Sequence, residues 1–444
     1  MTRHQKVWSS VVRLVLSGFS LKLGAAIAAF VLVGITSNVL GPDGRGNISL
    51  LITTIMLANL LNSMVGGVAM LPAIKKAISK QDLLQKIVIS YFWAIIVNIV
   101  AAFLFSIFFI VDSKLFLWTV ILGILFSFTS INSLFVMHLN KINSYMSINF
   151  WQNVISLGTF CIILNFIPQY IGNAFNISLL VAYTICFVFT SKSVEESYRY
   201  LESGNGYPNR WNTISSIISS GFSAQTGNIL LFLVYRIHFY LIGIYFGARA
   251  LGVYSVSISL MEALWMISGS IAIVMFSRIV KNGLDDDTEK YVLTCVKVSF
   301  SLTAIALVVV LLIPINVYNI IFGDGFDGIK NIILTVAAGS LATSVTTIFH
   351  HYFTAAQEYR VVLRISVISF FISLIGGGLF IPSGGGLFAA GLTSSVANVV
   401  MMLGYVYYFC QRTQSRPSAL LISTEDIRQL AAMARSFKRS NAHD

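Results

Sequence analysis

Twelve apolar stretches divide the chain, and each is long enough to cross a lipid bilayer. A helix of about 20 apolar residues spans the ~30 Å hydrocarbon core. Because no water satisfies backbone N–H and C=O groups in lipid, we expect every stretch to be an α-helix. The predicted spans lie near residues 14–39, 47–72, 87–111, 115–138, 146–167, 174–191, 216–246, 253–276, 291–315, 329–353, 361–381 and 386–409.

The composition agrees with a membrane fold. Hydrophobic residues make up 56% of the chain and charged residues 10%, whereas about 25% of the residues in a soluble domain are charged. A soluble fold has too little interior for so many apolar side chains, so the surplus must face lipid. We therefore predict an all-α polytopic membrane protein and exclude a soluble enzyme, a disordered chain and a disulfide scaffold.

The basic residues are distributed unevenly between the two sides of the membrane. If the N terminus is cytoplasmic, the inner segments hold 23 of the 29 Lys and Arg residues and the outer loops hold 4. Cytoplasmic loops of membrane proteins carry such an excess, so we predict that both termini are cytoplasmic. The net charge of +12 then reflects loops beside an anionic leaflet, and we expect no nucleic-acid partner.

Short matches at similar offsets indicate that the chain is an internal duplication. They pair Ser17-Gly18-Phe19-Ser20 with Ser220-Gly221-Phe222-Ser223, Gly41, Gly46 and Ser49 with Gly247, Gly252 and Ser255, and Thr129-Ser130, Phe135 and Tyr145 with Thr343-Ser344, Phe349 and Tyr359. Each half holds six spans, so we expect two six-helix bundles related by a pseudo-twofold along the membrane normal, with a site between them. The predicted regions are an N-terminal bundle over 1–191, a cytoplasmic linker over 192–212, a C-terminal bundle over 213–410 and a basic cytoplasmic tail over 411–444.

Three glycine-based motifs resemble those of the polysaccharide biosynthesis transporters. They are Asn38-Val39-Leu40-Gly41-Pro42-Asp43-Gly44-Arg45-Gly46, Phe246-Gly247 followed by Gly252-Val253-Tyr254, and Ile321-Phe322-Gly323-Asp324-Gly325-Phe326. This family contains the O-antigen and repeat-unit flippases of the multidrug/oligosaccharidyl-lipid/polysaccharide exporter superfamily. The resemblance implies a multi-pass protein of the bacterial inner membrane that moves an undecaprenyl-diphosphate-linked glycan, an intermediate of lipopolysaccharide or a related surface polysaccharide, by alternating access. Membrane lipid, a polysaccharide polymerase and chain-length machinery are the partners that we expect for such a protein.

Three ionisable residues, Lys22, Arg236 and Glu262, lie well inside apolar spans. A charge at a helix centre costs roughly 2.5–3.5 kcal/mol on insertion scales, so such residues normally face a bundle interior or a wet cavity. Helical spacing places each cation on a polar or small-residue face. These faces are Gly18, Lys22, Ala25, Ala26, Ala29, Val33 and Thr36 in the first span, and Gln225, Asn228, Arg236 and Gly243 in the seventh.

Two such faces opposite each other predict a cationic cavity. Fixed Lys and Arg side chains are what a diphosphate needs in a medium of low dielectric, because they offset its charge. We therefore predict Lys22, Arg236, Gln225 and Asn228 as substrate-binding residues. In the competing interpretation, Lys22 extends to the cytoplasmic interface and Arg236 pairs with Glu262 as a buried strut. A further interpretation of Glu262 is a site for a coupling ion, H⁺ or Na⁺.

Arg45 and Arg249 lie in two equivalent predicted outer loops. One interpretation is that they contact a phosphate at the exit, and the other is that they are ordinary interfacial anchors. The chain contains no nucleotide-binding P-loop, no spacing typical of a metal site and no catalytic arrangement of Ser, His and Asp, so we expect no cofactor and no metal.

A flippase for a polyprenyl-diphosphate-linked oligosaccharide agrees best with these features. The alternatives are a cation-coupled multidrug exporter of the same superfamily, which predicts acidic cavity residues, and a lipid II flippase. A glycan polymerase or ligase needs a sizeable outer loop with catalytic residues, and the longest one, near 316–328, carries no His or Arg. We therefore do not expect an enzyme.

Overall fold

The computed structural model describes residues 3–67, 80–109, 113–138, 141–199, 210–284 and 288–420. These residues form helices joined by short turns, and no β-strand occurs among them. The predicted all-α polytopic fold is therefore confirmed for this part of the chain. About half of the predicted linker, at 200–209, and most of the basic tail, at 421–444, lie outside the described residues.

The helices follow one another in two series, each opened by one very long helix. The first series consists of α1 (Arg3–Gly66), α3 (Lys80–Phe109), α4 (Ser113–His138), α5 (Ile142–Phe166) and α6 (Ala174–Arg199). The second consists of α7 (Arg210–Asn282), α8 (Thr288–Leu312), the short α9 (Ile315–Phe322), α10 (Ile329–Ala355), α11 (Tyr359–Phe380) and α12 (Gly386–Thr413).

Nine stretches of the described residues are long and apolar enough to cross a membrane. Three of them cover 47, 57 and 55 residues, more than twice the ~20 that one crossing requires. Each of the three is interrupted near its middle, at Gly41 in α1, at Gly247 in α7 and at the turn 381–386 between α11 and α12. The arrangement is therefore consistent with the twelve spans predicted from the sequence.

The breaks at Gly41 and Gly247 have the same backbone conformation. Their φ and ψ angles are 66° and −175° at Gly41 and 75° and −175° at Gly247. Glycine reaches positive φ without steric cost, so one residue is enough to end one span and begin the next. The prediction that Arg45 and Arg249 lie in outer loops is therefore wrong, because helical residues resume directly after each glycine.

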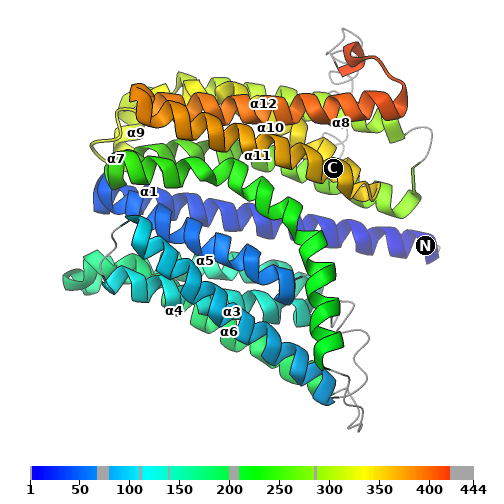
Figure 1. Ribbon diagram of the computed structural model, residues 1–444, viewed down its shortest axis with the longest axis horizontal. Helices are drawn as coiled ribbons and strands as arrows, with labels where there is room; N and C mark the ends of the chain where they lie inside the picture. The colour runs from blue at the N-terminus through cyan, green and yellow to red at the C-terminus, as the bar shows by residue number, and fades with distance from the viewer. Residues whose placement is uncertain are drawn as a thin grey trace, which may run out of the picture.

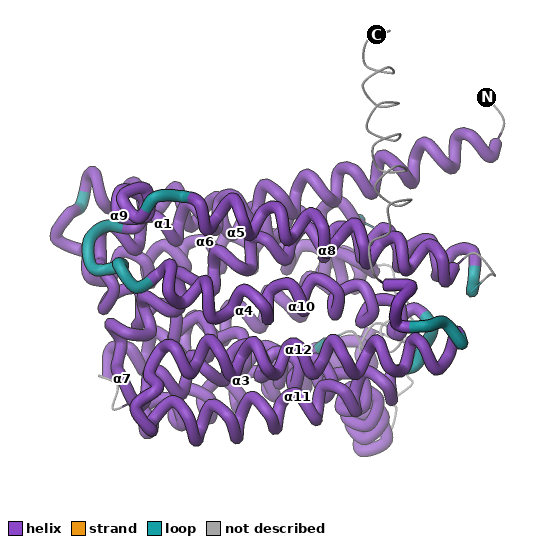
Figure 2. The backbone as a smooth tube through the Cα atoms, turned by 90° about the horizontal axis from the view of Figure 1, so that it is seen from above, coloured by secondary structure: helices purple, strands orange, loops and turns teal. Residues whose placement is uncertain are grey.

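The two series pack as two bundles that meet along α1 and α7 (Figure 1). The helices of both bundles run in nearly the same direction, as Figure 2 shows from above. Apolar clusters fill each bundle. The largest one in the second bundle surrounds Phe239, Tyr254 and Phe322, and one in the first surrounds Leu51, Leu122 and Phe160.

At the end of the molecule that carries Gly41 and Gly247, here called the closed end, the backbones of α1 and α7 touch. A Cβ atom on Gly46 would lie 1.8 Å from the carbonyl oxygen of Ala248, and one on Gly252 would lie 1.9 Å from that of Pro42. Gly252 is the repeat counterpart of Gly46, and Ala248 is that of Pro42, each at an offset of 206. The same contact therefore occurs twice, once on each side of the pseudo-twofold. The closed end is the one that the distribution of basic residues predicts to be outer.

Candidate substrate site beside helix α1

Lys22 lies on the first half of α1 and is exposed. It lies 19 residues before the break at Gly41, which corresponds to about 28 Å along the helix. The side chain lines two different cavities, one polar and one apolar. Lys22 is therefore far from the closed end and lies where the two cavities meet.

The polar cavity lies mainly within the first bundle and has a volume of about 580 Å³. It is bounded by α1, α4 and α5, with Met266 of α7 as the contribution of the second bundle. Its lining residues are Lys22, Ala25, Asn59, Phe126, Thr129, Ser130, Ser133, Tyr145, Met146, Ile148, Asn149, Gln152 and Met266. Hydroxyl and amide groups predominate among its polar atoms, and Lys22 supplies its only ionisable group apart from the Tyr145 phenol.

The apolar cavity, about 450 Å³ in volume, lies between α1 and the second half of α7. Its lining residues are Lys22, Leu23, Ala26, Ile27, Phe30, Ala263, Met266, Ile267, Gly269, Ser270 and Ile273. Leu23, Ile27 and Ile273 are exposed, and exposed apolar side chains of a membrane protein face lipid. We infer that this cavity is a lateral opening from the lipid toward Lys22.

A third cavity, of about 210 Å³, surrounds Arg45. It shares Phe126, Asn149 and Gln152 with the polar cavity, so the two form one polar path through the first bundle. Arg45 is only 6% exposed, and its Nε atom has no hydrogen-bond partner in the described part of the chain. The Nε–H group of Arg45 is therefore left without a hydrogen-bond acceptor among the described residues beside the path.

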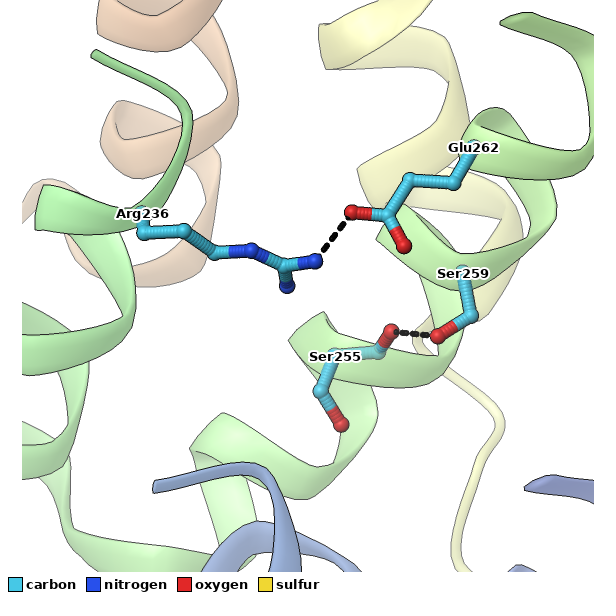
Figure 3. A network of polar contacts seen from close by, with 4 residues as sticks. All are labelled: Arg236, Ser255, Ser259 and Glu262. Carbon is cyan, nitrogen blue, oxygen red and sulfur yellow. Dashed lines mark hydrogen bonds and ion pairs between the residues drawn. The ribbon is translucent and has the colours of Figure 1, made fainter. Parts of the chain in front are cut away.

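Arg236 and Glu262 form an ion pair within α7, across its break at Gly247 (Figure 3). Their side chains are 18% and 35% exposed, so the pair is partly accessible. The guanidinium also lies 4.6 Å from the centre of the Phe239 ring. Arg45 interacts electrostatically with both partners, so two arginines and one carboxylate gather where the bundles meet near the closed end.

The polar faces predicted on the first and seventh spans differ in what they contact. On α1, Ala25, Ala29 and Val33 line the same polar path as Lys22 and Arg45. On α7, Asn228 donates a hydrogen bond of 3.0 Å to Gln225, and neither residue lines the three cavities. The polar path therefore lies inside the first bundle, closed in part by the second half of α7, and Gln225 and Asn228 lie outside the three cavities.

Arg249 is exposed near the closed end. Its guanidinium lies close to Gly325, within 3.6 Å of where a Cβ would be. Arg45 is buried instead, so the two arginines have different surroundings. At the offset of 206, the counterpart of Arg45 is Leu251 and that of Arg249 is Asp43.

Several cavity residues were missed in the sequence. Tyr145, Asn149, Gln152, Asn153 and Ser156 all lie on α5 and line the polar path. Their spacing of three or four residues places them on one helical face. That periodic run of amides inside an apolar span was the available signal.

Comparison with known proteins agrees with this architecture. Residues 197–331 match the family model described as polysaccharide biosynthesis protein. No curated protein matches the chain in sequence. The fold is similar to that of the lipid II flippase MurJ in an inward closed conformation, with a TM-score of 0.69 at 13% identity, covering 96% of this chain and 93% of that one.

Two structures described as multidrug resistance MATE family transporters of the MOP superfamily are also similar. The inward-facing one gives a TM-score of 0.67 at 12% identity and covers 90% of this chain and 98% of that one. The outward-facing one gives 0.56 at 14% identity and covers 93% and 96%. The resemblance predicted from the sequence is therefore confirmed: this chain is an all-α polytopic membrane protein with the fold of the MOP superfamily transporters, and its residues 197–331 match the polysaccharide biosynthesis protein family.

Proposed function

We propose that this protein is a flippase that moves a polyprenyl-diphosphate-linked oligosaccharide across the cytoplasmic membrane by alternating access. The observation that carries the proposal is the position of Lys22, where an apolar lateral opening meets a polar cavity. An amphipathic lipid needs both environments at once, and the anionic group at its centre needs a cation between them.

Each part of such a substrate has a matching region in the site. The polyprenyl chain stays in the lateral opening among Leu23, Ile27 and Ile273, beside the bilayer. The diphosphate binds Lys22 at the mouth. The glycan enters the polar cavity, whose hydroxyl and amide groups can replace the hydrogen bonds that its sugars lose on leaving water.

The charges along the path favour an anion. Lys22 and Arg45 line the path, Arg236 interacts electrostatically with Arg45, and Glu262 is the carboxylate that pairs with Arg236. In the absence of substrate, Glu262 satisfies Arg236. We propose that the diphosphate moves from Lys22 toward Arg45 and Arg236 and competes with Glu262 for the Arg236 guanidinium, which binds phosphate oxygens in a bidentate geometry.

The conformation agrees with loading from the end of the molecule opposite the closed end. The bundles touch at Gly46 and Gly252, and the side chain of Asn38 donates a hydrogen bond of 3.3 Å to the carbonyl oxygen of Ile320. The similarity to the inward-facing transporter exceeds that to the outward-facing one. With both termini in the cytoplasm, as the basic residues indicate, this conformation accepts substrate from the inner leaflet.

A cation-coupled multidrug exporter is the second candidate, because Glu262 is partly accessible and the fold is that of the MATE transporters. Glu262 is, however, paired with Arg236, and a cationic drug would meet three positive side chains. A lipid II flippase has the same physical requirements as the first candidate and differs in the glycan.

Deletion of the gene, followed by analysis of lipid-linked intermediates, separates these candidates. We expect undecaprenyl-diphosphate-linked repeat units of a surface polysaccharide to accumulate on the cytoplasmic leaflet, and re-expression of the protein to clear them. Accumulation of lipid II would assign the third candidate. Unchanged glycan with lost resistance to cationic dyes would contradict the proposal and favour the exporter.

A further inference from the structure

One face of α5 is polar although the helix lies in the membrane region, and the packing of the protein does not explain this polarity. Asn149, Gln152 and Asn153 project from it into the polar path, followed by Ser156 one turn later. Gln152 is buried, Asn153 is half-buried and Asn149 is exposed. Amides inside a membrane span are costly unless they bind something, because each carries two hydrogen-bond donors and an acceptor. We call these three residues the amide ladder.

The amide ladder is largely unused by the protein itself. The side chains of Asn149 and Gln152 make no hydrogen bond to any residue in the described ranges, although Gln152 is only 7% exposed. Asn153 donates a hydrogen bond of 2.8 Å to the carbonyl oxygen of Asn149, which leaves its oxygen free. A structural role in joining helices would require partners on α4 or α6, as Asn62 finds on Ser127 at 2.6 Å.

The other bundle shows that the fold does not require these amides. At the offset of 214 that relates Tyr145 to Tyr359, the counterparts of Asn149, Gln152 and Asn153 are Leu363, Ser366 and Val367. The counterpart of Ser156 is Phe370. The same helix position in a duplicated architecture is therefore stable with an apolar face, so the polarity of α5 serves something other than packing.

Aromatic rings stand beside the ladder. Phe126 lines both connected cavities, Tyr145 lines the larger one, and Tyr183 lines the one around Arg45. Sugars present hydroxyl groups around their edges and C–H groups on their faces. Free amides can donate and accept hydrogen bonds with the sugar hydroxyl groups, and aromatic rings can pack against the C–H faces. A site that places amides beside aromatic rings therefore suits a sugar.

We infer that the amide ladder of α5 binds the glycan of the transported lipid and determines which glycan is accepted. This inference rests on the proposed function and assigns a separate task to each part of the site. The cations at Lys22 and Arg45 bind the diphosphate whatever sugar it carries. Asn149, Gln152 and Asn153 bind the sugar hydroxyl groups, and the second bundle contributes only Met266 to this wall.

Binding to the purified full-length protein in detergent tests the inference. The probes are bare undecaprenyl diphosphate and the undecaprenyl-diphosphate-linked oligosaccharide extracted from host membranes. They differ by the glycan and by the terminal phosphate oxygen that the glycan esterifies, and each variant is compared with the wild type on the same two probes. The variants replace ladder residues with those of the other bundle, as Asn149→Leu with Asn153→Val, and as Gln152→Ser. Asn165→Leu is the matched control, because Asn165 is an exposed amide of the same helix whose side chain bonds the Cys161 carbonyl oxygen.

The wild type should bind the glycosylated probe more tightly than the bare one. Loss of two hydrogen-bonding amides should reduce that preference about tenfold or more in the double variant, because each hydrogen bond contributes roughly 0.5–1.5 kcal/mol. The affinity for bare undecaprenyl diphosphate should stay within about twofold of the wild-type value, which also shows that the variant is folded. Asn165→Leu should change neither affinity.

Two results would overturn the inference: an undiminished glycan preference in both ladder variants, or equal affinities of the wild type for the two probes. The proposed function fails on a different result. If Lys22→Gln and Arg45→Leu leave the affinity for bare undecaprenyl diphosphate unchanged, the cations do not bind the head group, whatever the ladder variants show.

Discussion

The two bundles share backbone conformations and contacts but differ in the side chains at corresponding positions. Gly41 and Gly247 have nearly equal dihedral angles, and Gly46 and Gly252 make the same backbone contact. Arg45, in contrast, has the fully buried Leu251 as its counterpart. Features present in both bundles therefore serve the architecture and its movement, whereas features of one bundle indicate the chemistry of the site.

The comparison also explains where the cavities lie. In the first bundle, α5 presents amides to a path between Lys22 and Arg45. In the second, Val345, Phe349 and Tyr405 belong to a buried apolar cluster, and the cavity between α11 and α12 is lined almost entirely by apolar side chains, including Val367. In this account the first bundle binds the substrate. The second bundle closes the polar cavity with Met266 and places the Arg236–Glu262 pair near the closed end.

The largest expected effect comes from breaking a feature that both bundles share. Gly46→Ala and Gly252→Ala should each abolish transport of the lipid-linked oligosaccharide, because a Cβ at either position would overlap a carbonyl oxygen at less than 2 Å. The halves then cannot meet at the closed end. Gly158→Ala is the control, since a Cβ there meets nothing within 4 Å.

If Gly46→Ala and Gly252→Ala differed in their loss of transport, the two symmetry-related contacts would not be equivalent in function. Transport in proteoliposomes and cross-linking between cysteines introduced near Pro42 and Ala248 measure both the activity and the closure. Wild-type cross-linking in either variant would show that the contact is dispensable.

Removal of the Arg236 side chain should have the next largest effect. Arg236→Ala leaves Glu262 unpaired and removes a phosphate ligand, so we expect transport to fall about 100-fold or more while the protein still inserts in the membrane. Glu262→Gln should be milder, because it frees the guanidinium for the diphosphate. Surface glycan and membrane abundance of each variant provide the measurement, and normal glycan with Arg236→Ala would contradict the role of this residue.

Exchange of Arg45 for its counterpart tests the difference between the bundles directly. Arg45→Leu should weaken binding of undecaprenyl diphosphate about tenfold or more, as expected for the loss of a charged hydrogen-bond donor. The reverse exchange, Leu251→Arg, should instead destabilise the protein, since Leu251 is 0% exposed in an apolar cluster. If Arg45→Leu and Leu251→Arg changed the affinity for undecaprenyl diphosphate equally and left the thermal stability unchanged, the two bundles would contribute equally to binding.

Lys22 is more exposed than Arg45, so its replacement should have a smaller effect. Lys22→Gln introduces the counterpart residue found at position 225 and should weaken binding about three- to tenfold. The loss should shrink as salt increases, because exposed charges are screened. An effect that does not depend on salt would place Lys22 in a structural rather than an electrostatic role.

The smallest effect is expected at Arg249, which is exposed near the closed end. Arg249→Ala should change transport less than about twofold, as surface charges contribute little. A loss as large as that of Arg45→Leu would show that the exit side also binds phosphate, in agreement with the first of the two interpretations of these arginines.

The fold was predictable because its signals are local. Apolar length determines the spans, and the repeated glycines mark the breaks. On the face predicted for Lys22, Ala25 and Val33 line the same path. Periodicity is a property of neighbouring residues, and no tertiary contact is needed to derive it.

The site was less predictable because its geometry depends on contacts between distant residues. Arg45 was expected in a loop, since nothing in the sequence shows that a single residue at Gly41 makes the whole turn. Gln225 and Asn228 share a face with Arg236 but bond each other instead of lining the cavities. The amides of α5 have a detectable period, but no Asp, Glu, Lys or Arg lies in residues 142–166. The predicted polar faces were those that carry a cation, and α5 carries none.

Discrimination between a charged and an uncharged polyprenyl lipid tests the central claim most directly. The affinities of the purified protein for undecaprenyl diphosphate and for undecaprenol should be measured for the wild type and for the triple variant Lys22→Gln, Arg45→Leu and Arg236→Gln. We predict a preference of the wild type for the diphosphate of about 100-fold or more and a loss of most of it in the triple variant. An equal preference in both proteins would show that these cations do not bind the head group and would contradict the cationic path.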